Sequence, residues 1–229
     1  MPVLKYYYDV LSQPARAVYI FLKLTKIPFE PHLVGLGKLE HLTDEFKQNL
    51  NRFQKIPFIH HGDFKLAESV AIVGYLSREY RNLVPDYLYP SDSKAQARVD
   101  EYLNWQHMNT RLCCASYFMY KWLLPLRTKS PPDQDKVEEA KSRMLSCLDE
   151  IEELWLGQGH KYITGNTVSV ADIFAASELE QPRLAGFDPT EGRPVLKAWL
   201  DSVKKDCNPY YDEAHIVLNK IVNKQKAKL

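Results

Sequence analysis

The pattern of the chain changes once, and this change most constrains its fold. In the first part, short strand-like runs alternate with helical ones, whereas the second part has only helical patterns. The stretch between them contains Pro85 and Pro90 and has little periodicity, which is typical of a linker. The sequence therefore predicts domains at residues 1–82 and 93–229, with a linker at 83–92.

The first part predicts the order βαβ, then a short helix, then ββα. The first three elements predict a parallel strand pair with a right-handed crossover, and residues 61–63 supply a hairpin turn. A proline at position 14 suits the first turn of a helix. Strands are expected at 4–8, 28–34, 57–60 and 64–66, and helices at 15–26, 42–50 and 68–80.

The second part is expected to be all-helical. Ser93 and Gln96 resemble a capping box, and Ser169 with Asp172 forms a clearer one, which predicts a folding role for Asp172. Pro125 is expected to end the first long helix region, with an apolar loop around it at 119–126. Helices are expected at 93–122, 135–156, from 169, at 194–205 and at 210–226.

Composition narrows the classes of function. The formal net charge is +1, which gives no reason to expect nucleic acid as a partner. The start of the chain does not resemble a signal peptide, and no apolar run reaches the ~20 residues of a membrane span. The cysteines at 113, 114, 147 and 207 form no C-x-x-C pair, so we expect no metal site and read them as free thiols of a cytoplasmic protein.

Five short stretches stand out along the chain: YDVLSQPARAV at 8–18, NRFQKIP at 51–57, LAESVAI at 66–72, RVDEYLNWQH at 98–107 and PYYDEAH at 209–215. In this order and spacing they resemble the theta class of the cytosolic glutathione transferases over nearly the whole chain. The resemblance implies an α/β thioredoxin-like N-terminal domain followed by an all-α C-terminal domain, and an enzyme that conjugates reduced glutathione to electrophiles.

Ser12 is the implied catalytic residue. A thiol with a pKa near ~8.5 is mostly protonated at neutral pH, and a hydroxyl donor beside a helix N-terminus favours its thiolate. Taken alone, Ser12 is better explained as an ordinary helix-cap serine. A second candidate is Tyr7, because other classes of the family use a tyrosine at the end of the first strand. The theta-like context favours Ser12.

The resemblance also implies how glutathione is held. Ile56, before a cis Pro57, pairs its backbone with the cysteinyl unit. Ser69 at a helix start suits the γ-glutamyl carboxylate, and Glu68 suits the ammonium group. The glycyl carboxylate falls to Lys55 and His41. Without the resemblance, Glu68 and Ser69 read as ordinary first-turn helix residues and Lys55 as a surface lysine.

The electrophile is expected against the second domain. His107, Met108 and Arg111 match positions where theta proteins contact substrate, and Arg111 suits an anionic leaving group. A surface ion pair for Arg111 and simple packing for Met108 are the alternatives. Glutathione is a co-substrate, no prosthetic group is implied, and a homodimer through the third helix and the start of the second domain is expected by resemblance.

Two departures qualify the resemblance. Mammalian theta proteins carry a C-terminal extension over the active site, and the chain to Leu229 reads as insect-like, without it, so a more open pocket is expected. Ala15 stands where some relatives have cysteine, which excludes thiol–disulfide chemistry there. Peroxidase and dehalogenase side activities are compatible with the site. The alternatives are a non-catalytic ligand-binding protein on this fold and a glutaredoxin-like enzyme, the latter disfavoured without a cysteine near position 12.

Overall fold

The computed structural model describes residues 2–227 and, within them, one four-stranded sheet with the order β2-β1-β3-β4. β1 pairs in parallel with β2, and β3 is antiparallel to both β1 and β4. Gly62, at φ 63°, supplies the left-handed turn between β3 and β4. The strands are β1 (Leu4–Tyr8), β2 (Glu30–Leu33), β3 (Phe58–His61) and β4 (Phe64–Ala67).

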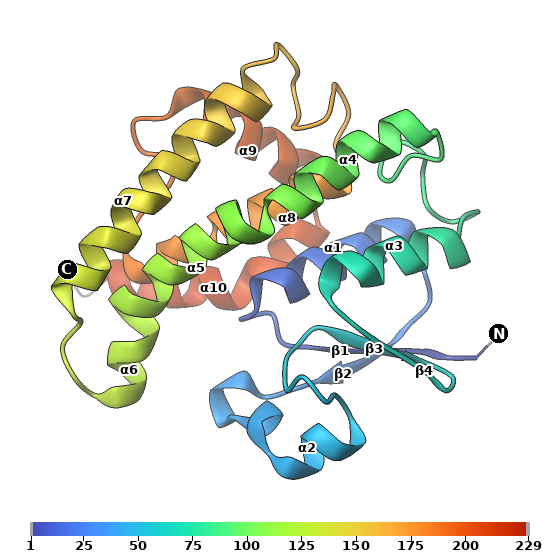
Figure 1. Cartoon of the computed structure of the whole chain (residues 1–229), viewed down its shortest axis with the longest axis horizontal. Helices are drawn as coiled ribbons and strands as arrows, with labels where there is room; N and C mark the ends of the chain where they lie inside the picture. The colour runs from blue at the N-terminus through green and yellow to red at the C-terminus, as the bar shows by residue number, and fades with distance from the viewer. Residues whose placement is uncertain (1, 228–229) are drawn as a thin grey trace. The chain divides into compact units, whose positions relative to one another are not determined.

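The sheet has helices on both faces (Figure 1). The α1 helix (Gln13–Thr25) packs against α3 (Ser69–Glu79), and α2 (Asp44–Asn49) lies on the opposite face. Side chains of β1 alternate accordingly. The Tyr6 hydroxyl donates to the carbonyl of Ala15 in α1 at 2.7 Å. Tyr7 instead joins a cluster with Phe58 and with Phe46 of α2.

The chain divides into two compact units. One comprises residues up to Asp86 together with Pro209–Val217, and we call it the sheet unit; the other comprises Tyr87–Asn208 and the residues from Leu218 onward, and we call it the helical unit. The last helix, α10 (Tyr210–Lys226), therefore contributes to both. Residues 1, 228 and 229 of the predicted domains lie outside the described residues.

The helical unit contains no named strand among residues 87–208 and 218–227, in agreement with the predicted fold class. Several of its α-helices run directly into π-helical segments. The elements are α4 (Ser93–Trp105), π-helix His107–Arg111, α5 (Leu112–Phe118), π-helix Met119–Leu123, α6 (Leu124–Thr128), α7 (Gln134–Glu150), π-helix Ile151–Leu156, α8 (Val170–Leu179), a 3₁₀ helix Gln181–Ala185, and α9 (Pro194–Cys207).

Two sequence predictions about the start and end of this first helical region were wrong. Asp92, and not Ser93, caps α4, because its carboxylate accepts from the backbone N–H groups of Lys94 and Ala95 at 3.1 and 2.9 Å. The expected loop at 119–126 is helical throughout. Its proline lies in the first turn of α6, directly after the π-helical segment Met119–Leu123, so the helical stretch continues past it.

Asp172 stabilises the centre of the helical unit, as predicted. It is fully buried in the first turn of α8, and its carboxylate accepts from the backbone N–H and the hydroxyl of Ser169, both at 2.9 Å. The same carboxylate accepts from the Ile163 N–H and the Trp199 Nε1, also at 2.9 Å. Burial raises the pKa of this carboxyl, and the four donors oppose that shift. Through these hydrogen bonds Asp172 links the loop that contains Ile163 to α8 and α9.

Candidate functional site

The strand register brings the residues around Ser12, Ile56 and Glu68 to the same end of the sheet. Tyr7 is opposite Phe58 and Phe58 is opposite Ala67, so the end of β1, the start of β3 and the end of β4 form one row. Ser12 follows the first of these strand ends by a short loop, Ile56 and Pro57 precede the second, and Glu68 and Ser69 follow the third. The sequence-distant motifs therefore meet in the sheet unit.

Ser12 stands immediately before α1 and is 8% exposed. Its backbone is extended (φ −87°, ψ 124°), and its carbonyl accepts the first helical hydrogen bond, from the Arg16 N–H at 3.0 Å. The Ser12 side chain makes no capping hydrogen bond to the first turn of the helix. The position is thus a helix cap by its backbone only, and its hydroxyl is not used for capping.

The loop that carries Ser12 is fixed from two sides. The Asp9 carboxylate accepts from the N–H of Leu11 at 2.9 Å and from the N–H of Leu36 at 3.1 Å, and the Asp9 carbonyl accepts from the Ser12 N–H at 3.0 Å. Arg16 is fully buried, and its Nη1 donates to the carbonyl of Val10 at 2.9 Å. A buried arginine needs such partners. Asp9 and Arg16 therefore act as positioning residues.

Sequence reasoning did not single out either positioning residue, although both lie inside the motif at 8–18. An arginine on an otherwise apolar helix face indicates a buried guanidinium, and it was the available clue for Arg16. For Asp9 the decisive partner, Leu36, is far away in the sequence, and no local pattern indicates it.

The turn before β3 has a specific backbone shape. The Ile56–Pro57 bond is cis, as predicted. Asn51 is buried, its Nδ2 donates to the carbonyl of Lys55 at 2.7 Å, and its Oδ1 accepts from the Phe53 N–H at 3.1 Å. These two hydrogen bonds hold the loop that presents Ile56. The Lys55 side chain is exposed, as a residue that meets a carboxylate at the rim of a site would be.

The start of α3 combines strain with a buried hydroxyl. Glu68 has φ 70° and ψ 110°, a sparsely populated conformation for a residue other than glycine. Such a residue costs of order 1–3 kcal/mol, and these residues gather at ligand-binding turns. Ser69, the first residue of α3, is 2% exposed. The Glu68 side chain is exposed.

His41 belongs to a different element from the other candidates. It lies in the 3₁₀ turn Glu40–Leu42, just before α2, and is half-buried. Thr43 caps α2 by accepting from the Phe46 N–H at 3.2 Å.

Tyr7 is part of a stack of rings. Its ring centroid lies 4.3 Å from that of Phe58 and 4.6 Å from that of His32, with interplanar angles of 8° and 22°. Burial raises the pKa of the Tyr7 hydroxyl. A raised pKa makes the hydroxyl a weaker proton donor, and the packing accounts for an aromatic residue at this position.

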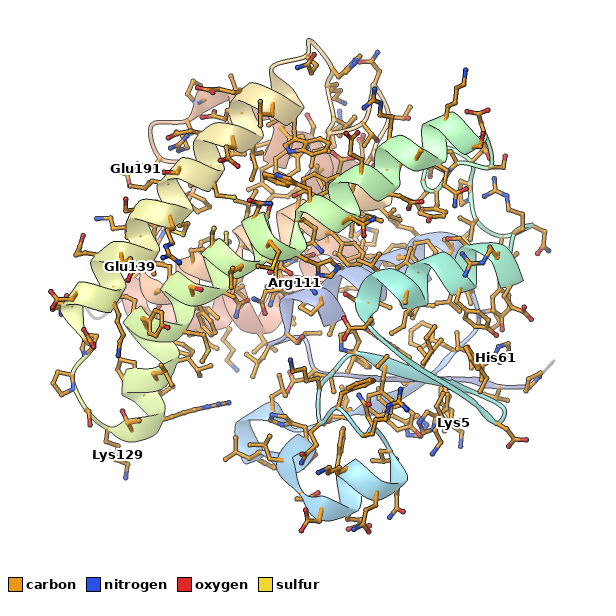
Figure 2. The ribbon with its side chains drawn as sticks, viewed as in Figure 1. Lys5, His61, Arg111, Lys129, Glu139 and Glu191 are labelled. Atoms are coloured by element: carbon orange, nitrogen blue, oxygen red, sulfur yellow. The ribbon has the colours of Figure 1, made fainter. Side chains whose placement is uncertain are left out.

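The predicted electrophile residues are neighbours on one π-helical segment of the helical unit, and Figure 2 labels Arg111 there. Met108 is 71% exposed, so packing does not explain it. Arg111 Nε donates at 2.8 Å to a carboxylate oxygen of Glu178, a residue that is 1% exposed. Arg111 is therefore in an ion pair, but with a buried acid of α8 and not at the surface.

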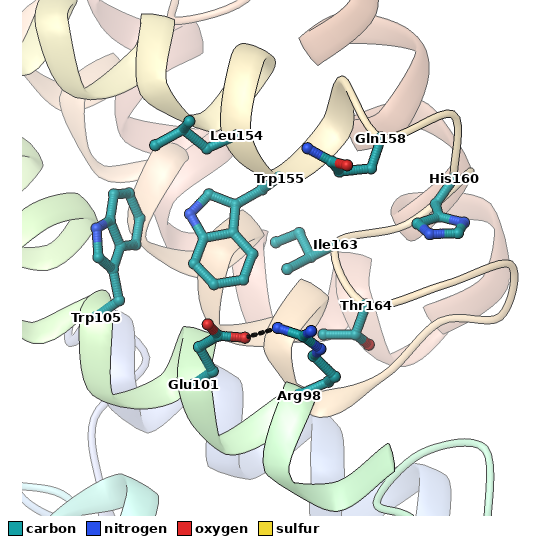
Figure 3. Close-up of a pocket in the computed structure, with 9 residues that line it drawn as sticks. All are labelled: Arg98, Glu101, Trp105, Leu154, Trp155, Gln158, His160, Ile163 and Thr164. Atoms are coloured by element: carbon teal, nitrogen blue, oxygen red, sulfur yellow. Dashed lines mark hydrogen bonds and ion pairs between the residues drawn. The ribbon is translucent and has the colours of Figure 1, made fainter. Parts of the chain in front are cut away.

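A pocket that the sequence did not indicate lies elsewhere in the helical unit (Figure 3). It has a volume of about 560 Å³, and two indole rings, of Trp105 and Trp155, stand 5.4 Å apart at its wall. Arg98 donates to Glu101 at 2.7 Å beside them. Its lining residues are Arg98, Glu101, Trp105, Leu154, Trp155, Gln158, His160, Ile163 and Thr164, and none of the predicted electrophile residues is among them.

Within residues 2–227, no helix is long and apolar enough to cross a membrane. The same residues contain no group of three or more His, Cys, Asp or Glu side chains arranged to hold a metal ion.

Comparison with protein families gives two matches in separate parts of the chain. Residues 2–78 match the N-terminal domain of glutathione S-transferase, and residues 107–205 match its C-terminal domain. The chain belongs to the glutathione S-transferase family. Bovine glutathione S-transferase theta-1 is 42% identical over 225 residues, which cover 98% of this chain and 92% of that protein. The chain is therefore a theta-class member of the family.

Solved structures of theta-class members have the same fold. The apo form of human glutathione S-transferase T1-1 superposes with a TM-score of 0.90 at 42% identity, covering 96% of this chain and 91% of that one. Human glutathione transferase theta-2, in complex with glutathione and an unknown ligand, superposes with a TM-score of 0.89 at 38% identity and covers 98% and 91% of the two chains. The predicted order of a thioredoxin-like domain and an all-helical domain is confirmed.

Proposed function

We propose that this glutathione transferase conjugates reduced glutathione to electrophilic substrates and that the Ser12 hydroxyl donates a hydrogen bond to the glutathione sulfur. The observation that carries the proposal is the state of Ser12: a buried serine at the start of α1 whose hydroxyl does not cap the helix. A theta-class relative has been solved with glutathione bound. Membership of that class makes the tripeptide the expected ligand of the sheet edge described above.

The chemistry follows from the charge that develops on sulfur. A hydrogen bond to a charged group contributes about 1.5–3 kcal/mol, and one pKa unit corresponds to ~1.4 kcal/mol. One hydroxyl donor therefore lowers the pKa of the bound thiol by roughly 1–2 units. The N-terminus of α1 adds a partial positive charge. Ser12 acts as a donor, and the thiolate itself attacks the electrophilic carbon.

The remaining site residues would anchor the rest of the tripeptide. We assign the backbone of Ile56, held before cis Pro57, to the cysteinyl unit, and Ser69 at the N-terminus of α3 to the γ-glutamyl carboxylate. The exposed carboxylate of Glu68 would pair with the ammonium group. Lys55 and His41 would bind the glycyl carboxylate. These roles rest on the convergence of the strand ends and on family membership.

For the electrophile we propose the exposed Met108 with His107 as contacts. The ion pair with Glu178 gives Arg111 a fixed orientation, so its proposed role is to present a positive charge to an anionic leaving group from a held position. Peroxidase and dehalogenase side activities would use the same thiolate.

The wider biological setting is also a proposal. We assign glutathione binding to residues 1–82 and electrophile binding to residues 93–229, with a linker at 83–92. We propose a homodimer and a cytoplasmic detoxification role, as is usual for the family. The insect-like subclass and its more open pocket stay predictions, and the relatives reported above are bovine and human.

Titration of bound glutathione tests the assignment. The ultraviolet absorbance of the thiolate is followed against pH for the wild type, Ser12→Ala and Tyr7→Phe. We expect Ser12→Ala to raise the pKa of the bound thiol by roughly 1–2 units and Tyr7→Phe to leave it unchanged, since phenylalanine preserves the ring stack. The reverse result would move the thiolate donor to Tyr7. Ligand binding without turnover of any electrophile in the wild type would favour a non-catalytic binding protein instead.

A further inference from the structure

The sheet unit contains a pocket that the proposed function does not use. It lies between the end of β2 and the short helix α2, and its volume is about 560 Å³. That volume is within the ~300–1,000 Å³ typical of sites for small molecules. None of the residues assigned above to glutathione lines this pocket. The transferase chemistry therefore leaves it without an occupant.

A deeply buried hydroxyl at the wall of the pocket has no hydrogen-bond partner. Tyr7 lines the pocket and is 8% exposed, because its ring is stacked against the rings of Phe58 and His32. In the part of the chain that the structure describes, the Tyr7 hydroxyl forms no hydrogen bond, whereas that of the neighbouring Tyr6 donates to a carbonyl at 2.7 Å. Buried phenol groups are normally hydrogen-bonded. A polar atom of a ligand in the pocket would satisfy Tyr7.

The rest of the inner surface is largely apolar. Val34 and Phe46 are buried in the same hydrophobic cluster as Tyr7, and the partly buried Leu50 packs against it; all of them line the pocket. Leu33 also lines the pocket and is 76% exposed. A flat apolar ligand would remove the exposed part of this surface from water, which is favourable in proportion to the area covered.

The charges at the pocket are mainly negative. Glu40 and Glu45 line it with exposed side chains, and no lysine or arginine is among its described lining residues. The nearby Lys38 is 84% exposed, and its Nζ lies 4.0 Å from a carboxylate oxygen of Glu40. The imidazole of His32 lies 2.7 Å from a carboxylate oxygen of Glu30, so Glu30 balances any positive charge on that ring. The pocket therefore favours a cation over an anion.

We propose that this pocket is a further ligand site, which binds small aromatic amines in their protonated form. The aromatic body packs against Leu33, Val34 and Leu50. A polar atom of the ring forms the missing hydrogen bond with the Tyr7 hydroxyl, and the ammonium group faces the carboxylates of Glu40 and Glu45. Neither Ser12 nor bound glutathione takes part, so failure of this proposal would leave the proposed transferase activity intact.

Isothermal titration calorimetry of the purified full-length protein with tryptamine tests the proposal. Reduced glutathione is present at saturation, so that its own site is occupied. Tryptophol and indoleacetate are the comparison ligands, because they carry an uncharged and an anionic group on the same ring. We expect tryptamine to bind with a Kd of roughly 0.1–2 mM, as is usual for a ligand of its size, and to bind more tightly than either comparison ligand. Absence of saturable tryptamine binding, or binding no tighter than that of indoleacetate, overturns the proposal.

Variants locate the bound amine. Tyr7→Phe keeps the ring stack and removes the hydroxyl, so it should weaken tryptamine binding by about two- to tenfold. Glu45→Gln should weaken it by about two- to fivefold, and this exposed substitution keeps the test valid if Tyr7→Phe does not fold. Asp44→Asn is the matched control, because it removes the adjacent acid of α2, which does not line the pocket, and should bind tryptamine as the wild type does. If Tyr7→Phe and Glu45→Gln both bind with wild-type affinity, the amine is bound elsewhere and the assignment is wrong.

Discussion

Replacing Asp172 by alanine should destabilise the helical unit strongly. The change would leave the N–H groups of Ile163 and Ser169 and the indole Nε1 of Trp199 without their acceptor, all in a fully buried site. A buried donor without a partner costs about 1–3 kcal/mol. Removing the desolvated carboxylate returns part of this loss. The expected net loss is roughly 3–5 kcal/mol of unfolding free energy.

Denaturant unfolding followed by tryptophan fluorescence measures this loss. All the tryptophans of the chain lie in the helical unit, so the signal reports on the unit that contains Asp172. Asp92→Ala is the matched control, because Asp92 also caps a helix but is exposed and accepts only from its own first turn. Its expected cost is about 1 kcal/mol. If Asp172→Ala costs no more than Asp92→Ala, the loop and α9 contacts do not stabilise the fold as argued.

Three further predictions concern the two units. Asp9→Ala removes the acceptor of two N–H groups that fix the candidate catalytic loop. We expect kcat to fall about tenfold or more while the unfolding midpoint changes little. A fall in kcat that is accompanied by a large fall in the unfolding midpoint would indicate a merely structural role. Burial and a hydrogen bond to Glu213 raise the pKa of Tyr19 to about 12. The stability that the protonated Tyr19 hydroxyl contributes is therefore complete below its unfolded pKa of ~10 and is lost as the pH rises through the folded value. Ultraviolet titration of tyrosinate in the wild type and in Tyr19→Phe measures this pKa. Arg111→Ala leaves the buried Glu178 carboxylate without this arginine and should cost about 3–5 kcal/mol of stability, whereas an unchanged unfolding midpoint would show that the pair contributes nothing.

Local features of the sequence were sufficient to predict most elements. The limits of α10 follow from its periodicity, and the start of α8 follows from Ser169 and Asp172, because both depend on neighbours within one or two turns. The cis bond before Pro57 was expected from the family motif. The roles of the glutathione-site residues stay predictions.

Features that depend on distant residues could not be predicted. The carboxylate of Asp9 meets Leu36, and Arg111 meets Glu178, across long stretches of sequence. The π-helical segment at His107–Arg111 could not be recognised in the sequence either. Its hydrogen bonds span five residues and not the four of an α-helix, and the apolar pattern of the sequence does not reveal this difference. Pro125 predicts the end of a helix, but the same residue is also compatible with a first turn, which is where it lies.

The sheet unit contains Pro209–Val217, which places a constraint on the order of folding during synthesis. Lys23 of α1 stands over the ring of Tyr210 at 5.2 Å and lies 3.7 Å from a carboxylate oxygen of Glu213. A ribosome releases these partners only after the entire segment from Tyr87 to Asn208 has been made. The nascent sheet unit therefore stays incomplete, with one side of α1 uncovered, until the helical unit has been synthesised. A translation pause before Pro209 would lengthen the period in which chaperones can bind that surface or aggregation can start from it.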